Sequence, residues 1–216
     1  MALTGMKHAV FAPITKYNEG EKPTYGTGFV VGGAIKADLT ITYAEGSLYA
    51  DNVRREYKKQ FANGGISTEF DDIAIENRAT MFGHRIVTES GKKVLVKGAA
   101  DEPVHGGFGY YKTKVVGGET SYEATWYLDT VFNETGESAE TQNDSITFQT
   151  VEVDGMILAV PGLGNDDWEE TFEAATESEV KTWLDTRANV SSTRMVSTTS
   201  ASAPAQTTTT SVTNKS

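Results

Sequence analysis

The sequence contains no cysteine, so it offers no disulfide, no thiolate zinc site and no ligands for an iron–sulfur cluster. It also lacks any apolar run that approaches the roughly 18 residues of a membrane-spanning helix. The first residues, MALTGMKHAVFAPIT, lack the unbroken apolar core of a secretion signal. We therefore expect a protein that is made and kept in the cytosol until it joins a larger assembly.

Basic residues are scarce relative to acidic ones. The chain has 19 Lys and Arg against 30 Asp and Glu, which gives a formal net charge of −11. Affinity for a nucleic-acid backbone comes largely from Lys and Arg that displace counterions. The composition therefore argues against a protein that grips nucleic acid, and it suits one that repels it.

Histidine is also rare, and the three residues His8, His84 and His105 lie far apart without HExxH or His-x-His spacing. With no cysteine and no local ligand pair, we expect no metal site and no cofactor. His84 follows a predicted helix, where a hydrogen-bond donor suits the exposed carbonyl groups.

Alternation of apolar and polar residues is the dominant pattern. Residues 121–133, SYEATWYLDTVFN, place Trp126 and Leu128 on one side and Thr125, Tyr127 and Asp129 on the other, which predicts a half-buried strand. Further strands are predicted at 29–35, 37–43, 92–96 and 145–153, the last with a bulge near Val151. The dipeptide Asn63-Gly64 predicts a tight hairpin turn.

Two segments have helical spacing instead. In residues 70–84, Asp71 or Asp72 is the expected N-cap, Ile75, Ala79 and Phe82 share a face, and Gly83 ends the helix. In residues 176–187, Thr176 and Glu179 form a capping box, and the apolar face comprises Val180, Trp183, Leu184 and Arg187.

These elements predict one folded unit over residues 1–190, of β-rich α+β class: an antiparallel sandwich or barrel with a flanking helix and a second short C-terminal helix. Residues 191–216 contain 15 Ser and Thr among 26 residues and no aromatic residue. Such a segment cannot bury enough apolar area to offset its ordering entropy, so we expect a flexible tail.

The stretch AADEPVHGGFGYYK, residues 99–112, raises the question of a phosphate-binding loop. A P-loop needs Gly-Lys-Ser/Thr in direct succession before a helix, whereas here two tyrosines precede Lys112 and the chain continues as a strand. We expect Gly106, Gly107 and Gly109 to let the strand bend or to let another chain approach closely.

The loops at 133–144 and 165–170 are acidic, and the second surrounds Trp168 with Asp166, Asp167, Glu169 and Glu170. This pattern is compatible with a glycosidase, whose activity would be lost when Asp167 or Glu169 becomes an amide, but the chemistry depends on a separation in space. Adjacent loop carboxylates are ordinarily a solvated surface, and neither EF-hand nor G-x-S-x-G spacing occurs, so we expect no enzyme. A carbohydrate-binding or adhesin module, suggested by Trp126, Tyr127 and Trp168, is an alternative.

Several short stretches, taken in their order and spacing, resemble the major tail protein family of long-tailed, non-contractile bacteriophages, especially those of Gram-positive hosts. These stretches are FAPIT at 11–15, TYGT at 24–27, LYADN at 48–52, MFGH at 81–84 and the opening of AADEPVHGGFGYYK. The resemblance covers roughly residues 4–187.

The resemblance implies a tail tube subunit that assembles with itself into stacked hexameric rings in the virion, and it supplies no catalytic residue. Implied partners are the tape measure, tail terminator and baseplate proteins, with DNA passing only transiently through the lumen. A tail-like bacteriocin tube is the nearest alternative. The expected inter-subunit residues are Leu48, Tyr49, Asp51, Asn52, Tyr57, Phe61, Gly106 and Gly107.

The resemblance also suggests an extended loop, beginning at LYADN and reaching Phe61, that contacts the next ring. We expect residues 44–70 to be mobile in the free chain and to order on assembly. Acidic residues that face the lumen would repel DNA phosphates over about 10 Å at 0.1 M salt.

Overall fold

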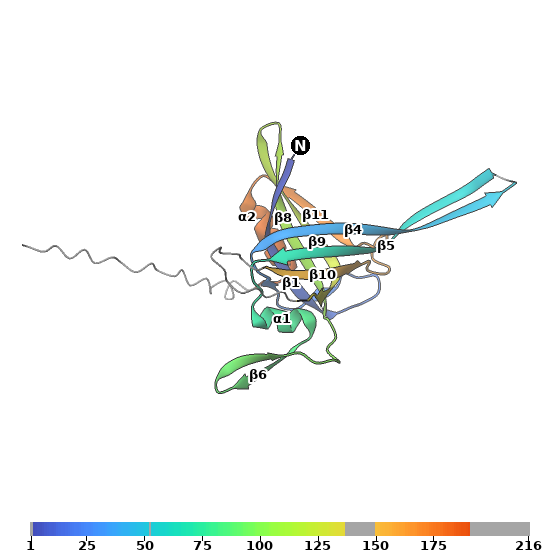
Figure 1. Cartoon of the computed structure of the whole chain (residues 1–216). Coiled ribbons are helices and arrows are strands. Elements are labelled where there is room, and N and C mark those ends of the chain that lie inside the picture. The colour runs from blue at the N-terminus through green and yellow to red at the C-terminus, as the bar shows by residue number, and fades with distance from the viewer. Residues whose placement is uncertain (1, 52, 137–149, 191–216) are drawn as a thin grey trace, which may run out of the picture.

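The computed structural model describes residues 2–51, 53–136 and 150–190, and these residues form antiparallel strands and two short helices (Figure 1). The strands are β1 Ala2–Lys16, β2 Thr24–Tyr25, β3 Phe29–Val30, β4 Ala34–Ala50, β5 Val53–Phe70, β6 Arg85–Glu89, β7 Lys92–Val96, β8 His105–Val116, β9 Glu119–Glu134, β10 Val151–Leu158 and β11 Glu169–Ala174. The helices are α1 Ile75–Phe82 and α2 Glu177–Arg187. The predicted β-rich α+β class is confirmed, whereas closure into a sandwich or barrel stays a prediction.

Nine strands form one sheet in the order β2-β1-β8-β9-β10-β5-β4, with β3 beside β1 and β11 beside β9. Strand β9 forks this sheet. Strand β8 pairs along one edge of β9, while the other edge is shared by β11, which pairs with Tyr122–Tyr127, and by β10, which pairs with Asp129–Glu134. Strands β6 and β7 form a separate two-stranded sheet.

Both faces of β9 are buried, because the fork lets a separate apolar cluster form on each face. Trp126 and Leu128 pack with Leu184 of α2, whereas Tyr127 and Phe132 belong to the cluster that includes α1. The prediction of a half-buried strand was therefore wrong: Thr125, Tyr127 and Asp129 are also buried. Burial raises the pKa of Asp129, and a contact of 2.8 Å between its Oδ1 and Nδ1 of His105 opposes this rise.

The two helices differ in how well their ends were predicted. The capping box of α2 is confirmed, with the Thr176 side chain accepting from the Glu179 amide. Gly83 ends α1 at φ 71°, as predicted, but the N-cap is Ala74. Asp71 does not cap the helix because its Oδ1 accepts from the amide of Gly33 at 2.6 Å, which ties the chain before the helix to the loop before β4.

The predicted turn at Asn63-Gly64 is wrong. Strand β5 runs straight through this dipeptide, where Gly64 pairs with Ile41 of β4 and with Ile157 of β10. Hydrogen bonds on both edges outweigh the local preference for a turn. The two strands of the hairpin instead stay paired out to Ala50 and Val53.

Other predicted strands were placed correctly. Residues 37–43 lie within β4, and residues 92–96 are β7. Residues 29–35 contain β3 and the start of β4. The strand predicted at 145–153 is described from residue 150 onward, and the predicted bulge near Val151 is wrong, because Val151 to Val153 pair in a regular register with Phe70 to Thr68 of β5. Most of the acidic loop at 133–144 lies outside the described residues. Among the residues that are described, no helix is long and apolar enough to cross a membrane.

The glycines of β8 serve packing within the chain. An added Cβ at Gly106 would lie 2.3 Å from the ring of Phe11, and one at Gly107 would lie 2.1 Å from the ring of Trp126. Both glycines are buried. The structure therefore accounts for them by aromatic rings of the same subunit, and we do not carry them into the contact surface considered below.

We predict that Gly107→Ala destabilises the chain by about 1–3 kcal/mol, since the new methyl group overlaps Trp126 and Tyr25. The melting temperature should fall on the order of 5 °C in a thermal unfolding experiment. Gly65→Ala is the matched control, because Gly65 also lies in a strand and its Cβ would meet nothing within 4 Å. Equal melting temperatures for the two variants would contradict this account of the β8 glycines.

Candidate functional site

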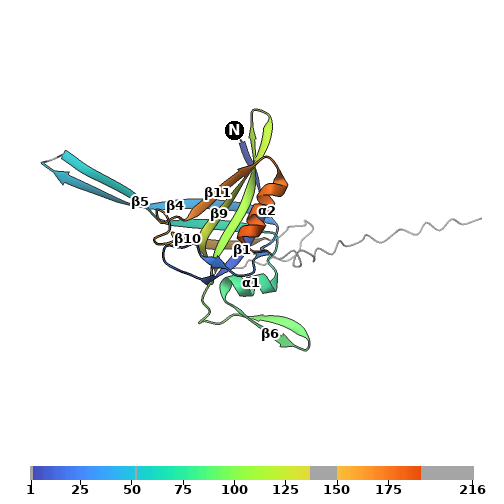
Figure 2. The same ribbon diagram turned by 180° about the vertical axis from the view of Figure 1, so that it is seen from behind.

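The most distinctive feature of the molecule is a long β-hairpin that leaves the body. The outer parts of β4 and β5, residues 43–61, are called the arm here, and they project far from the sheet in two opposite views (Figures 1 and 2). The two strands remain paired along the arm out to Ala50 and Val53. Asp51 has a φ of 53°, the left-handed conformation that a two-residue hairpin turn favours.

Large apolar side chains are exposed near the arm tip. Leu48, Tyr49 and Val53 are 58%, 65% and 59% exposed, and Tyr43 and Tyr57 are also exposed. A cluster of exposed apolar residues on a projecting element is typical of a protein-binding surface. The predicted contact residues Leu48, Tyr49, Asp51, Tyr57 and Phe61 all lie on the arm, and Asn52 lies outside the described residues.

Polar and aromatic side chains cross-link the two strands of the arm. Nζ of Lys59 lies 2.8 Å from Oε1 of Glu45 and 4.3 Å from the ring centroid of Tyr43. The hydrogen bond from Lys59 lowers the pKa of Glu45, and the same bond raises the pKa of Lys59. Farther out, the Arg54 guanidinium lies 5.0 Å from the ring of Tyr57. The contacts of Lys59 join β4 to β5, whereas Arg54 and Tyr57 both lie on β5, and together these contacts support an arm that keeps its hairpin form.

A stack of aromatic rings anchors the arm at its root. The ring of Phe61 lies 4.5 Å from that of Trp168 at an interplanar angle of 3°. Trp168 is in turn nearly parallel to Tyr127, at 6.3 Å, and Tyr127 to Phe108, at 6.5 Å. This row connects the arm to the core, so the orientation of the arm depends on the loop that carries Trp168.

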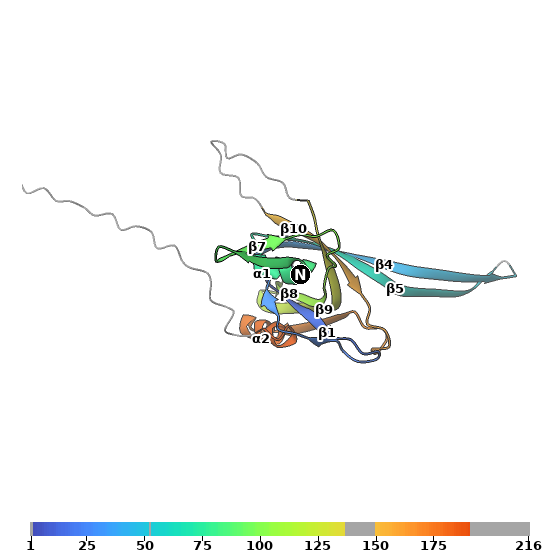
Figure 3. The same ribbon diagram turned by 90° about the horizontal axis from the view of Figure 1, so that it is seen from below.

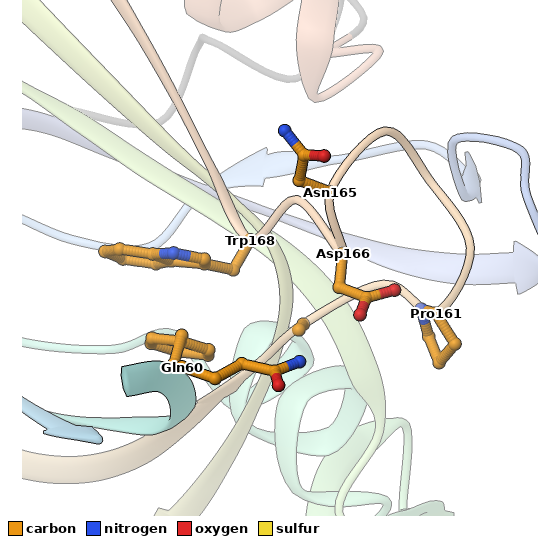
Figure 4. A pocket seen from close by; sticks show the side chains of 7 residues that line it. Gln60, Pro161, Asn165, Asp166 and Trp168 are labelled. Atoms are coloured by element: carbon orange, nitrogen blue, oxygen red, sulfur yellow. The ribbon is translucent and has the colours of Figure 1, made fainter. Parts of the chain in front are cut away.

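A small hollow of about 230 Å³ lies beside this root. Figure 4 shows Trp168 and Gln60 at one end of it and Asp166 and Pro161 at the other. The face of the Trp168 ring that stacks on Phe61 is not available to a sugar. Trp126 and Tyr127 are buried and cannot contact a sugar either. The geometry thus does not favour the carbohydrate-binding alternative.

The outer edge of β4 is the second candidate contact surface. Within the described part of the chain, β4 ends the strand order of the sheet and pairs only with β5 along its 17 residues. A long edge strand presents a row of unpaired backbone N–H and C=O groups, which favours pairing with another chain. The alternation of apolar and polar residues in β4 predicts a strand, but it does not tell an edge strand from a central one. This surface was therefore not predicted.

One outward face of the sheet is acidic. The register places Asp38, Ser67 and Asp154 in one row across β4, β5 and β10, and Lys36, Glu69 and Glu152 in the next row. Lys36 contacts Asp38. Three carboxylates, those of Glu69, Glu152 and Asp154, form no ion pair with a basic side chain in the described structure.

The histidines and most of the loop carboxylates considered as candidate catalytic or metal-binding residues form hydrogen bonds or ion pairs within the chain. Each histidine contacts a carboxylate: His8 with Asp185, His84 with Asp101 and His105 with Asp129. In the acidic loop, Asp166 accepts from the Gly162 amide at 2.8 Å, and Glu170 contacts Lys22 and Arg187. Across the described residues no group of three or more His, Asp or Glu side chains is placed to hold a metal ion.

No protein-family model matches the chain, and no curated protein matches its sequence. We therefore infer the function from the physical properties of the surfaces described above.

We predict that Phe61→Ala loosens the arm, because it removes the ring that stacks on Trp168. Amide exchange should become faster over residues 43–60, and the free energy of unfolding should fall by about 1–2 kcal/mol. Tyr57→Ala, farther out on the same strand, is the control and should leave exchange at the root unchanged. Identical exchange in both variants and the unaltered chain would show that the stack does not hold the arm.

Proposed function

We propose that this chain is the structural subunit of a tail tube, which assembles with copies of itself into stacked hexameric rings. The observation that carries the proposal is a 17-residue strand with an unpaired outer edge, whose outer part forms one strand of an exposed apolar arm. A monomer gains nothing from such an edge, which is an aggregation liability unless a partner covers it. The resemblance to major tail proteins specifies what kind of assembly this is.

A tube needs two head-to-tail contacts, one that closes around a ring and one that propagates from ring to ring. The outer edge of β4 suits the first contact, because a strand of the neighbouring subunit can complete its hydrogen-bond ladder. The arm suits the second, since it reaches far beyond its own body (Figure 1). In such a ring the sheets of six copies would join into a continuous barrel.

The acidic face of β4, β5 and β10 suits the lining of the tube. Six copies at −11 each would carry a formal charge of −66 per ring. A basic lining would bind the DNA backbone and slow its passage, whereas carboxylates such as Glu69, Glu152 and Asp154 keep DNA off the wall. The tape measure, terminator and baseplate proteins are the further partners that this function requires, and the virion tail is its location. A tail-like bacteriocin tube would use the same contacts.

We predict that the purified protein at high concentration forms long hollow tubes visible by electron microscopy. A variant in which residues 46–58 are replaced by a two-residue turn should stay folded and form no long tubes, because it lacks the contact between rings. Only monomers in the unaltered sample would contradict the proposed function. Tubes of normal length from the shortened variant would contradict the role of the arm.

We predict that reversing Glu69, Glu152 and Asp154 to Lys leaves tube assembly intact but makes the tubes retain DNA. Tubes assembled with short duplex DNA and then treated with nuclease should contain protected DNA only in this variant, and salt should release it. Reversal of the exposed Glu19, Glu21 and Glu119 is the control with equal charge. Protected DNA in the control alone, or in neither variant, would contradict a lumen lined by the acidic face.

A further inference from the structure

Helix α2 and strand β11 form an apolar groove on the surface. The rings of Phe172 and Trp183 are stacked at 5.4 Å with an interplanar angle of 15°, and the Arg187 guanidinium lies 5.2 Å from the Trp183 ring. Beside these rings is a hollow of about 380 Å³, which is completed by Ser178, Glu179, Thr182 and Thr186. Both aromatic residues are partly exposed, and Thr182 and Thr186 beside them are exposed.

This groove is not required by the packing of the chain itself. The buried side of α2 carries Val180 and Leu184, which enter the apolar cluster around Trp126. Phe172 and Trp183 pack at the margin of that cluster and stay partly exposed. Exposed aromatic residues at the margin of a core are typical of contact sites.

The arm and the groove lie at different ends of the molecule. In Figure 1 the arm extends to the right while α2 lies on the left part of the body, and Figures 2 and 3 show the same separation from behind and from below. A chain whose arm points away from its own groove offers that groove to a second copy. Repetition of such a head-to-tail contact generates a filament when its rotation does not close a ring.

The chemistry of the two surfaces is complementary. The arm tip presents the apolar Leu48, Tyr49 and Val53, followed by Arg54 and Arg55. The groove presents two aromatic rings, and beside it lie Glu179, whose carboxylate accepts from Thr176 in the capping box, and Glu177, which contacts Lys7. The arm as a whole has four basic and three acidic residues, a net charge of +1, so the rest of the chain carries −12 and the total is −11. Attraction between the basic residues of the arm and the acidic body would favour docking of the arm on another copy.

We propose that the arm tip of one copy binds in the Phe172–Trp183 groove of the next copy. This inference rests on the proposed function and names the receiving site for the contact between rings. The apolar tip covers the two rings, and Arg54 and Arg55 approach the carboxylates at the start of α2. Each subunit thus both donates an arm and receives one.

The absence of cysteine makes a direct test possible, because introduced thiols can pair only with each other. One preparation carries Val53→Cys at the arm tip and a second carries Thr182→Cys in the groove, and both positions are exposed. One of the two carries a tag that changes its mass, so that the mixed dimer differs in size from both homodimers. The two are mixed, assembled and mildly oxidised, and the disulfide between the two proteins is measured on a non-reducing gel. Circular dichroism checks that each variant folds.

A mixture of Val53→Cys with Glu119→Cys is the matched control, since Glu119 is exposed on the β8–β9 hairpin. We expect about tenfold more mixed disulfide from the first mixture, because a specific contact raises the local thiol concentration. Addition of 1 M salt should slow the reaction, since it screens the charges that guide docking.

The outcomes separate this inference from the proposed function. Tubes with mixed disulfide at the control level overturn the groove as the receiving site and leave the tube function standing. Mixed disulfide above the control without tubes supports the arm–groove contact and contradicts the tube. Neither tubes nor excess disulfide contradicts both.

Discussion

The fold depends on the backbone hydrogen bonding of β9, because this strand has both edges and both faces occupied. Three strands pair with it, β8 on one edge and β10 and β11 on the other, and an apolar cluster covers each face. The fork at Asp129 separates the layer that carries α2 from the layer that continues through β10 and β5 to β4. Burying Asp129 in this position costs free energy, which its contact with His105 offsets.

Strand β9 has hydrogen-bonding partners on both of its edges, whereas β4, in the described structure, has a partner strand on one edge only. The ladder that begins at β9 ends in a strand whose outer groups have no partner among the described residues, and the same two strands then leave the body as the arm. In the free chain, only water can pair with the backbone donors and acceptors along this edge, and the apolar side chains at the arm tip are exposed to water at a cost in free energy. A repeating assembly is an arrangement in which every copy can cover these groups on its neighbour, and in the proposed tube the acidic sheet face would form a wall to which DNA does not adhere.

Features set by neighbouring residues were predictable from the sequence, and features set by distant residues were not. The capping box of Thr176 and Glu179 and the helix end at Gly83 are local and were correct. The turn at Asn63-Gly64 failed because β4 and β10 pair with both sides of β5 there, which only the folded sheet reveals. The acidic face depends on a register that aligns Ser67 with Asp154, far apart in the chain. The arm residues Leu48 to Phe61 were singled out by family resemblance, whereas Trp168 as their anchor required the structure.

The central claim is that a copy of the chain covers the outer edge of β4. Amide hydrogen exchange along residues 34–42, compared between the free chain and the assembled state, tests this claim most directly. The account predicts that the amides of β4 without a partner in β5 exchange rapidly in the free chain and become strongly protected on assembly. Equal exchange of these amides in both states would contradict it, because the edge would then be open to water in the assembly as well.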